Sequence, residues 1–266
     1  MAGISDGKSG GLVPVQRKFT RSPAPEGSVD KFIKTIRKRF DFLQEEEDLL
    51  ISRMDGEAHF HAGQTIVAEG ETIDYSSLLF AGIACREKMS VEGERQITEL
   101  QVPGDFIDLH SYPLERLDHS LTALTECKTV KLYHDDIDDL IDERPRFARI
   151  LWFATMTDAS IHREWIQNLG TRTGSRRMAH LFCEMHTRMD VVGLVEDGSF
   201  AFPLTQAELG EALGFTFVHV SRVLKELRDK GLAEFKDRRV HIESPERLAE
   251  FCGFDPAYLN LTRRNR

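Results

Sequence analysis

Residues 204–227 constrain the fold of this chain more than any other segment, because they predict two short helices joined by a tight turn. Thr205 is placed to cap the first helix, and Glu208 three residues later completes a capping box. Gly214 ends that helix in a left-handed conformation, and Thr216 caps the next one. This spacing predicts a helix-turn-helix, in which the second helix enters the major groove of DNA.

The second helix of this pair divides into two faces. Val220, Val223 and Leu227 recur at helical spacing and face inward, which turns the neighbouring side chains outward. We expect DNA contacts from the two caps, from the outward side chains and from two arginines further along the chain: Thr205, Thr216, Phe217, Val218, His219, Ser221, Arg222, Lys225, Arg238 and Arg239. An ordinary helical hairpin in an all-helical domain is the alternative.

The segment after the second helix favours DNA binding over this alternative. Residues 234–242 resemble a β-hairpin whose tip carries Arg238 and Arg239, which predicts the wing of a winged helix. The net charge of −9 is unevenly distributed, since residues 1–170 hold 20 basic and 30 acidic residues, whereas residues 171–266 hold 15 and 14. The second part can therefore present a basic surface to phosphates, and double-stranded DNA is the expected partner.

Residues 58–133 have a different pattern, in which short β-like runs alternate with glycine-containing turns. The clearest runs are residues 64–67, 77–80 and 130–133. Many short strands at regular spacing predict a barrel or a double-sheet roll. A helical block over residues 134–141 follows this roll.

A long helix is predicted from about Pro145 to Leu169, because this segment contains no glycine and no further proline. Its residues recur at spacings of four and three, which predicts a coiled-coil seam and a homodimer through Phe147, Leu151, Ala154, Asp158, Ile161 and Trp165. A second stripe through Ile150, Phe153 and Ile166 is expected to pack on the roll. A helix packed within a monomer is the alternative.

The order of roll, long helix and winged helix resembles the Crp/Fnr family of bacterial transcription regulators. The resemblance covers about residues 30–250, and its specific parts are Arg-Arg-Met-Ala-His-Leu at 176–181, Leu-Thr-Gln-Ala-Glu-Leu-Gly at 204–210, Val-His-Val-Ser-Arg at 218–222 and Gly-Asp-Phe-Ile at 104–107. It implies an α+β fold: an N-terminal β-roll of the cyclic-nucleotide-binding type (a double-stranded β-helix or jelly roll), a long dimerisation helix and a C-terminal winged helix-turn-helix. It also implies a homodimer that regulates promoters at a palindromic site, with RNA polymerase as a further partner.

The length of the chain allows two modest domains with terminal extensions. We expect a disordered tail, a sensor roll, a dimerisation helix, a DNA-binding domain and a C-terminal extension at residues 1–28, 29–142, 143–170, 171–250 and 251–266. The sequence has no apolar run long enough to cross a bilayer, and its N-terminus lacks the apolar block of a signal peptide. A cytoplasmic protein without a membrane partner is therefore expected.

The predicted recognition helix departs from the family pattern at one position. Family members often carry a glutamate, two intervening residues and then Ser-Arg or Gly-Arg; here Ser221 and Arg222 match, and Val218 stands where the glutamate would be. A valine cannot accept a hydrogen bond from cytosine, although it can pack on a thymine methyl group. We expect Arg222 to contact guanine, with Ser221 and His219 nearby and Lys225, Arg238 and Arg239 on phosphates.

The candidate sensor pocket consists of Asp108, Leu109, His110, His119 and Ser120. Cyclic-AMP-binding members carry a Gly-Glu pair and an Arg-Ser pair for the ribose and the cyclic phosphate, whereas this chain has Asp108-Leu109 and His119-Ser120 in these places. The cation for the phosphate is missing, since an ordinary imidazole is mostly neutral at pH 7. Cyclic AMP is therefore not the expected ligand.

No cofactor is assigned from the sequence. The oxygen-sensing branch of the family needs an N-terminal cysteine cluster, but the four cysteines are scattered at Cys85, Cys127, Cys183 and Cys252. They are expected to be reduced, partly buried thiols, so an N-terminal iron–sulfur cluster is not predicted. Haem or a metal held by the histidines in and beside the roll stays open.

An enzyme is the competing function class. His59 and His61 would lie on one face of a strand, as in metal-dependent oxygenases of the cupin type. In those proteins a glutamate follows the histidine pair after three or four residues, whereas Gln64 stands here and Glu69 comes later. Because an oxygenase would also leave the winged helix without a role, we expect a regulator.

Overall fold

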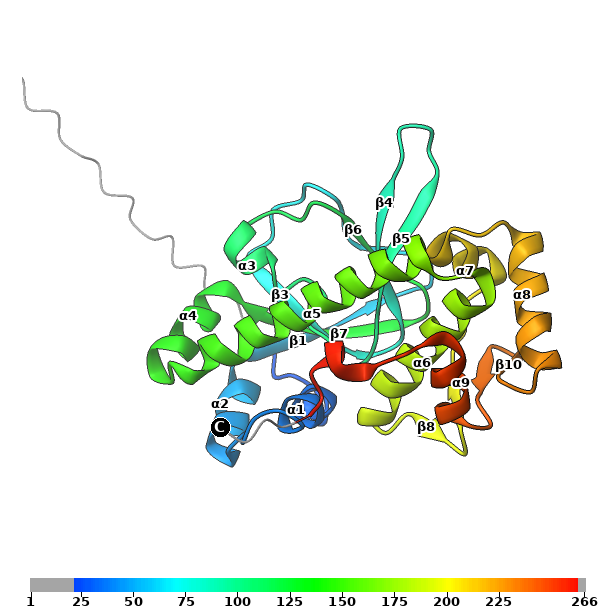
Figure 1. Cartoon of the computed structure of the whole chain (residues 1–266). Helices are drawn as coiled ribbons and strands as arrows, with labels where there is room; N and C mark the ends of the chain where they lie inside the picture. The colour runs from blue at the N-terminus through cyan, green and yellow to red at the C-terminus, as the bar shows by residue number, and fades with distance from the viewer. Residues whose placement is uncertain (1–21, 263–266) are drawn as a thin grey trace, which may run out of the picture.

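The computed structural model describes residues 22–262, in which a β-roll, a long helix and a winged helix-turn-helix follow one another (Figure 1). The predicted α+β fold is confirmed. Within residues 22–262, no helix combines the length and the apolar character that a membrane span requires.

The β-roll consists of two antiparallel sheets, with strand orders β1-β7-β3 and β2-β6-β4-β5. Leu78 and Leu79 are neighbours on β3 and therefore point to opposite faces of the first sheet, yet both are fully buried. Leu79 packs in the interior of the roll, whereas Leu78 packs beneath the surrounding helices. The strands are β1 (Met54–Phe60), β2 (Thr65–Val67), β3 (Tyr75–Ala81), β4 (Ala84–Met89), β5 (Arg95–Gln101), β6 (Ser120–Ala123) and β7 (Cys127–Tyr133).

Four shorter helices surround the roll: α1 (Asp30–Arg37), α2 (Gln44–Arg53), α3 (Ser111–Leu114) and α4 (His134–Glu143). The ring of Phe32 on α1 packs edge-to-face on Phe106, with 5.1 Å between the ring centroids. Order begins before α1, since Pro23 forms a β-bridge with Asp55 and Ser28 is buried. The predicted disordered tail is therefore too long at its C-terminal end, and residues 1–21 lie outside the described residues.

The long helix α5 (Arg146–Thr171) turns its predicted seam toward its own protomer. Leu151 and Trp165 are 6% and 5% exposed, and Phe147 and Ile161 are also buried. Asp158 is bonded to Arg86 of the roll. The predicted seam is therefore not the dimer interface. Spacings of four and three are equally typical of a helix face that packs on its own domain. Ile166, which we expected to pack on the roll, is 70% exposed.

The C-terminal part is a winged helix-turn-helix. Its four-stranded sheet has the order β10-β11-β9-β8, and Phe182, Phe200 and Phe202 are fully buried in its core. The elements are α6 (Gly174–Val191), β8 (Val195–Glu196), β9 (Ser199–Ala201), α7 (Gln206–Leu213), α8 (Phe217–Asp229), β10 (Glu234–Lys236), β11 (Arg239–His241) and α9 (Pro245–Cys252).

The two parts share one hydrophobic core. Ile97 and Leu100 of β5 belong to the same buried cluster as Trp165 of α5 and Phe182 of α6. After α9 the chain turns back to α5 through the short 3₁₀ helix η1 (Pro256–Leu259), drawn red in Figure 1. The roll and the winged helix-turn-helix are therefore packed against each other as well as joined by α5.

Candidate DNA-binding surface and sensor region

The ends of α7 and α8 follow the predicted capping residues. The hydroxyl of Thr205 accepts from the Glu208 N–H at 3.1 Å, and the Glu208 carboxylate accepts from the Thr205 N–H at 2.6 Å. Gly214 has φ 66° and ends α7, and the Thr216 hydroxyl caps α8 by accepting from the His219 N–H. The predicted helix-turn-helix is confirmed down to its caps.

Two residues near this turn hold it in place. A Cβ atom on Gly210 would lie 2.6 Å from the carbonyl oxygen of Phe215, so only glycine permits this approach. Arg177 donates to the carbonyl oxygens of Leu213 at 2.8 Å and Leu169 at 2.7 Å. Because these carbonyls lie at the ends of α7 and α5, Arg177 ties the helix-turn-helix to the long helix.

The outward face of α8 carries apolar and cationic groups. Val218 is 66% exposed, with Phe217, Ser221, Arg222 and Lys225 exposed beside it. Lys225 is paired with Asp229, and Ser221 donates to the side chain of Gln206 at 2.6 Å. Arg222 forms no ion pair within the described part of the chain, so its guanidinium is free to bind a base or a phosphate.

His219 is the exception on this helix. Its ring lies 4.5 Å from that of Phe215, measured between centroids, and a Cβ atom on Gly174 would overlap its Nε2. The imidazole is half-buried against the start of α6. His219 thus packs between elements of its own domain, and its position beside a base stays a prediction.

The predicted wing is the hairpin of β10 and β11. Lys236 pairs with Arg239, and the two residues between them, Asp237 and Arg238, both have positive φ, 51° and 57°. Two such residues make a type I′ turn, whose twist matches a two-residue hairpin. Arg238 and Arg239 are exposed, which leaves both guanidinium groups at the tip of the wing.

The roll contacts the helix-turn-helix directly through β5. Arg95 lies 3.0 Å from the carboxylate of Glu211 on α7, and the Gln96 side chain donates to the Glu211 carbonyl at 2.6 Å. These contacts join the first helix of the helix-turn-helix to the second sheet of the roll.

Two segments of the chain match known domain families. Residues 57–144 match the cyclic nucleotide-binding domain, and residues 176–251 match the Crp-like helix-turn-helix domain. The chain belongs to the Crp/Fnr family. In this family the helix-turn-helix binds DNA, and this Crp/Fnr chain is a DNA-binding transcription regulator.

Relatives in other bacteria span most of this Crp/Fnr chain. The transcriptional activator protein FnrL of Cereibacter sphaeroides is 26% identical over 200 residues, which cover 74% of this chain and 80% of FnrL. The transcriptional activator protein Anr of Pseudomonas protegens is 22% identical over 191 residues, or 72% of this chain and 78% of Anr. The solved structure of FixK2 from Bradyrhizobium japonicum has the same fold, with TM-score 0.66 and 24% identity over 79% of this chain and 98% of that one.

A buried ionic network joins the roll of this Crp/Fnr regulator to α5. Arg86 on β4 is almost wholly buried and donates to Glu99 at 2.7 Å and to Asp158 of α5 at 2.6 Å. Its other nitrogens donate to the Ile107 carbonyl at 3.2 and 2.9 Å. His162, one turn beyond Asp158, lies 3.3 Å from Glu99. Buried charges need such partners, so this network fixes the register of α5 on the roll.

The acidic side of this network contains residue types that can bind a metal ion. Glu99, Asp158 and His162 each offer a ligand atom, and these atoms lie within 4.8 Å of one another. The Arg86 guanidinium, however, already donates to both carboxylates and occupies the cation position. Burial and the nearby Asp158 raise the pKa of Glu99 well above its usual range, and burial lowers the pKa of His162.

Of the five predicted sensor residues, Leu109 and His110 line one cavity, whereas Asp108, His119 and Ser120 do not line it. Asp108 is buried and accepts from the Ser77 N–H, and burial raises its pKa to about 7. The rings of His110 and His119 lie 5.0 Å apart, and burial lowers the pKa of His110 to about 3. The Ser120 hydroxyl accepts from the Glu69 N–H, and Leu109 packs in the core.

The histidine pair of the oxygenase alternative does not converge. His59 lies 2.8 Å from the Glu57 carboxylate, and His61 lies 3.1 Å from that of Glu126. Both histidines are exposed in these surface pairs. The four cysteines are buried free thiols, and the sulfur atoms of Cys183 and Cys252 lie 3.9 Å apart.

Sequence reasoning missed the charged residues inside the roll. Arg86 lies between Cys85 and Glu87 on β4, and Glu99 lies between Thr98 and Leu100 on β5, so neither charge interrupts an apolar run. The local pattern therefore did not indicate that either charge is buried or that the two would meet. The exposed side of α5 was also missed, although its spacing could have been read as a second seam.

Proposed function

We propose that this regulator acts as a homodimer that binds a palindromic promoter site through two copies of α8 and works there with RNA polymerase, without control by cyclic AMP. One observation carries the proposal. The exposed side of α5 presents large apolar residues at the spacing of a coiled coil.

This side of α5 is called the outer stripe. Trp152 is 69% exposed and Ile166 70%, and Met156 between them is also exposed. Spacings of four and three, continued over three heptads, are typical of a two-helix interface. The outer stripe lies opposite the residues that pack on the roll, and it consists of Trp152, Met156, Ala159, Arg163, Ile166 and Gly170.

Pairing of two outer stripes would form a two-fold symmetric dimer that suits a palindromic DNA site. A two-fold dimer places its two recognition helices one helical turn of DNA apart, about 34 Å, so each α8 meets one half-site. On each half-site the free guanidinium of Arg222 suits guanine, and Val218 suits a thymine methyl group. Lys225 and the wing residues Arg238 and Arg239 suit the phosphates.

The sensor region supports a mechanism without cyclic AMP. His119-Ser120 stands where cyclic-AMP-binding relatives carry Arg-Ser, and burial lowers the pKa of His119, so its imidazole is neutral at pH 7. Arg86, the cation within the roll, is already held by Glu99 and Asp158. A cyclic phosphate would therefore have to break a buried ion pair in order to bind.

In vitro selection of random duplex DNA tests the proposal. The full-length protein, purified without metal or nucleotide, is expected to enrich a palindrome whose half-sites lie about ten base pairs apart. Cyclic AMP at a saturating concentration of about 1 mM should change the affinity for that palindrome less than about twofold.

Two controls separate the parts of the proposal. Trp152→Glu should abolish the palindrome while leaving weak binding to single half-sites, because it places two charges in the dimer seam. Leu114→Glu, at an exposed leucine on α3, is the matched control and should leave selection unchanged. Enrichment of a non-palindromic site, failure of the folded protein to enrich any site, or a large gain on adding cyclic AMP would each contradict the proposal.

A further inference from the structure

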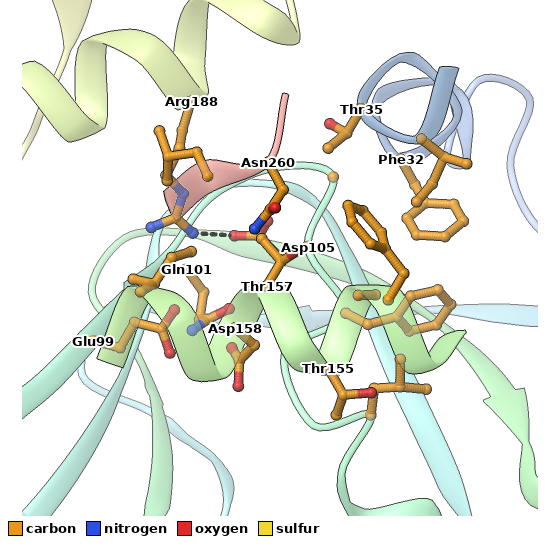
Figure 2. Close-up of a pocket in the computed structure, with 18 of the residues that line it drawn as sticks. Phe32, Thr35, Glu99, Gln101, Asp105, Thr155, Thr157, Asp158, Arg188 and Asn260 are labelled. Carbon is orange, nitrogen blue, oxygen red and sulfur yellow. Dashed lines mark hydrogen bonds and ion pairs between the residues drawn. The ribbon is translucent and has the colours of Figure 1, made fainter. Parts of the chain in front are cut away.

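A cavity of about 90 Å³ lies where the roll, α1, α5, α6 and the C-terminal segment meet. Figure 2 shows it between Phe32 and Thr35 of α1, Thr157 of α5 and Asn260 after η1. A water molecule needs about 10–15 Å³ of such space, so the cavity has room for about six non-hydrogen atoms. An occupant of this cavity would therefore contact the roll, α5 and α6 at the same time.

Unpaired polar atoms line one side of this cavity. Glu99 is fully buried and Gln101 is 1% exposed, yet none of the described residues hydrogen-bonds Glu99 Oε1 or Gln101 Nε2. Thr157 Oγ1, across from them on α5, is also buried and has no hydrogen-bond partner among the described residues. Buried polar atoms in folded proteins nearly always have partners, which indicates that another molecule supplies them.

The two residues on β5 lie on the same side of the cavity. Glu99 and Gln101 are two positions apart on one strand, so their side chains leave the same face of the sheet, and Figure 2 shows both beside the cavity. The Gln101 nitrogen can only donate a hydrogen bond, whereas the Glu99 oxygen can accept one. A group that carries an acceptor next to a donor matches this pair.

Phenylalanines form an apolar part of the lining, called the phenylalanine side. Phe32 of α1 and Phe106 of the roll pack on each other, and Phe153 of α5 and Leu109 also line the cavity. A ligand that fits the polar and the apolar lining therefore has a polar head and an apolar body.

The charged residues of the cavity select against an anion. Arg86 is bonded to Glu99 and Asp158, and Arg188 lies 2.6 Å from Asp105, a pair drawn as a dashed line in Figure 2. Neither guanidinium has its charge free, and the three carboxylates would repel a negative ligand.

We propose that this cavity binds a small uncharged molecule with a carboxamide-type head group, held by Glu99 and Gln101, and an apolar body against the phenylalanine side. Burial raises the pKa of Glu99, and a carboxamide satisfies this residue whether or not it carries a proton, because the head group both donates and accepts. A carboxylate has no donor to offer. The inference does not depend on the proposed function, since binding is measured without DNA.

Isobutyramide and isobutyrate provide a matched pair of probes, since both have six non-hydrogen atoms and almost the same shape. Ligand-detected NMR with the full-length protein is expected to show isobutyramide binding with a dissociation constant on the order of 1 mM. Isobutyrate should bind at least about tenfold more weakly, because its charge would lie beside Glu99 and Asp158.

Variants locate the binding site. Gln101→Leu removes the donor at nearly constant volume and should weaken isobutyramide binding about tenfold. Thr157→Val, on a different element, should weaken it by a smaller factor, which keeps the test valid if Gln101→Leu fails to fold. Gln44→Leu, at an exposed glutamine on α2, is the control and should bind normally.

Three results would overturn the inference. The first is the absence of isobutyramide binding at 20 mM, which is roughly twenty times the expected dissociation constant. The second is equal or tighter binding of isobutyrate. The third is isobutyramide binding that neither Gln101→Leu nor Thr157→Val weakens. The first result would mean that water alone fills the cavity and satisfies its polar atoms.

Discussion

Replacing Trp152 by alanine should separate dimerisation from folding. Trp152 is 69% exposed in the protomer, and a tryptophan side chain buries up to about 200 Å², so its pairing would bury about 140 Å² per copy. At 25 cal/mol per Å² this is about 3.5 kcal/mol per copy, of which association returns only a part. Because each dimer contains two copies, we expect Trp152→Ala to reduce the free energy of dimer association by about 3 kcal/mol. This corresponds to a rise of at least about 100-fold in the dimer dissociation constant.

Leu151, the neighbouring residue, gives the contrasting result. It is 6% exposed and packs in the core beneath the roll, so Leu151→Ala should cost about 2–5 kcal/mol of unfolding free energy. Sedimentation velocity over a concentration series measures the dimer constant, and urea unfolding well above that constant measures stability. The reasoning is refuted if Trp152→Ala leaves the dimer constant unchanged, or if Leu151→Ala dissociates the dimer while unfolding as the wild type does.

Three further changes test other parts of the structure. Arg222→Ala should weaken binding to the selected palindrome by about 1–3 kcal/mol and relax one base position; equal loss on every sequence, measured by competition, would make Arg222 a phosphate contact. Asp108 has a pKa of about 7 when folded and about 3.9 when unfolded, so its burial should lower stability by up to about 4 kcal/mol as pH rises from 4 to 7. Asp108→Asn should therefore gain stability relative to wild type at pH 8 and not at pH 4, in urea unfolding at both values; a constant difference would show that Asp108 does not titrate in this range. Gly210→Ala should destabilise the protein by about 1–3 kcal/mol, because its Cβ would press on the Phe215 carbonyl, and an unchanged melting temperature would contradict this.

Local chemistry explains which elements could be predicted from the sequence. The caps at Thr205 and Thr216 and the positive φ at Gly214 depend on residues at most three positions apart, so their pattern is visible in the chain itself. The wing is similar, since its hairpin closes through two residues. The two sheets of the roll were expected only as a class, because strand order depends on contacts between distant segments.

The face of α5 could not be assigned from spacing alone. The predicted seam through Leu151 and Trp165 and the outer stripe through Trp152 and Ile166 both repeat every three or four residues. The predicted seam contains more apolar residues than the outer stripe because it packs on the roll and on α6. Residues in a hydrophobic core are apolar more often than residues on a helix surface. The packing of His219 on Phe215 could not be predicted for the same reason, since a polar residue on a recognition helix can also pack against its own domain.

The ionic contacts give the roll a physical route to the DNA-binding surface. Arg86 ties the roll to α5, Arg188 on α6 reaches Asp105 in the turn after β5, and Arg95 reaches Glu211 on α7. The first two arginines also line the cavity, so an occupant that shifts Glu99 or Asp105 changes the partners of both. A ligand can move an equilibrium only by binding two arrangements differently. A neutral ligand that leaves both ion pairs intact would therefore stabilise the arrangement described here, whereas an anion would compete with the carboxylates for Arg86 and Arg188.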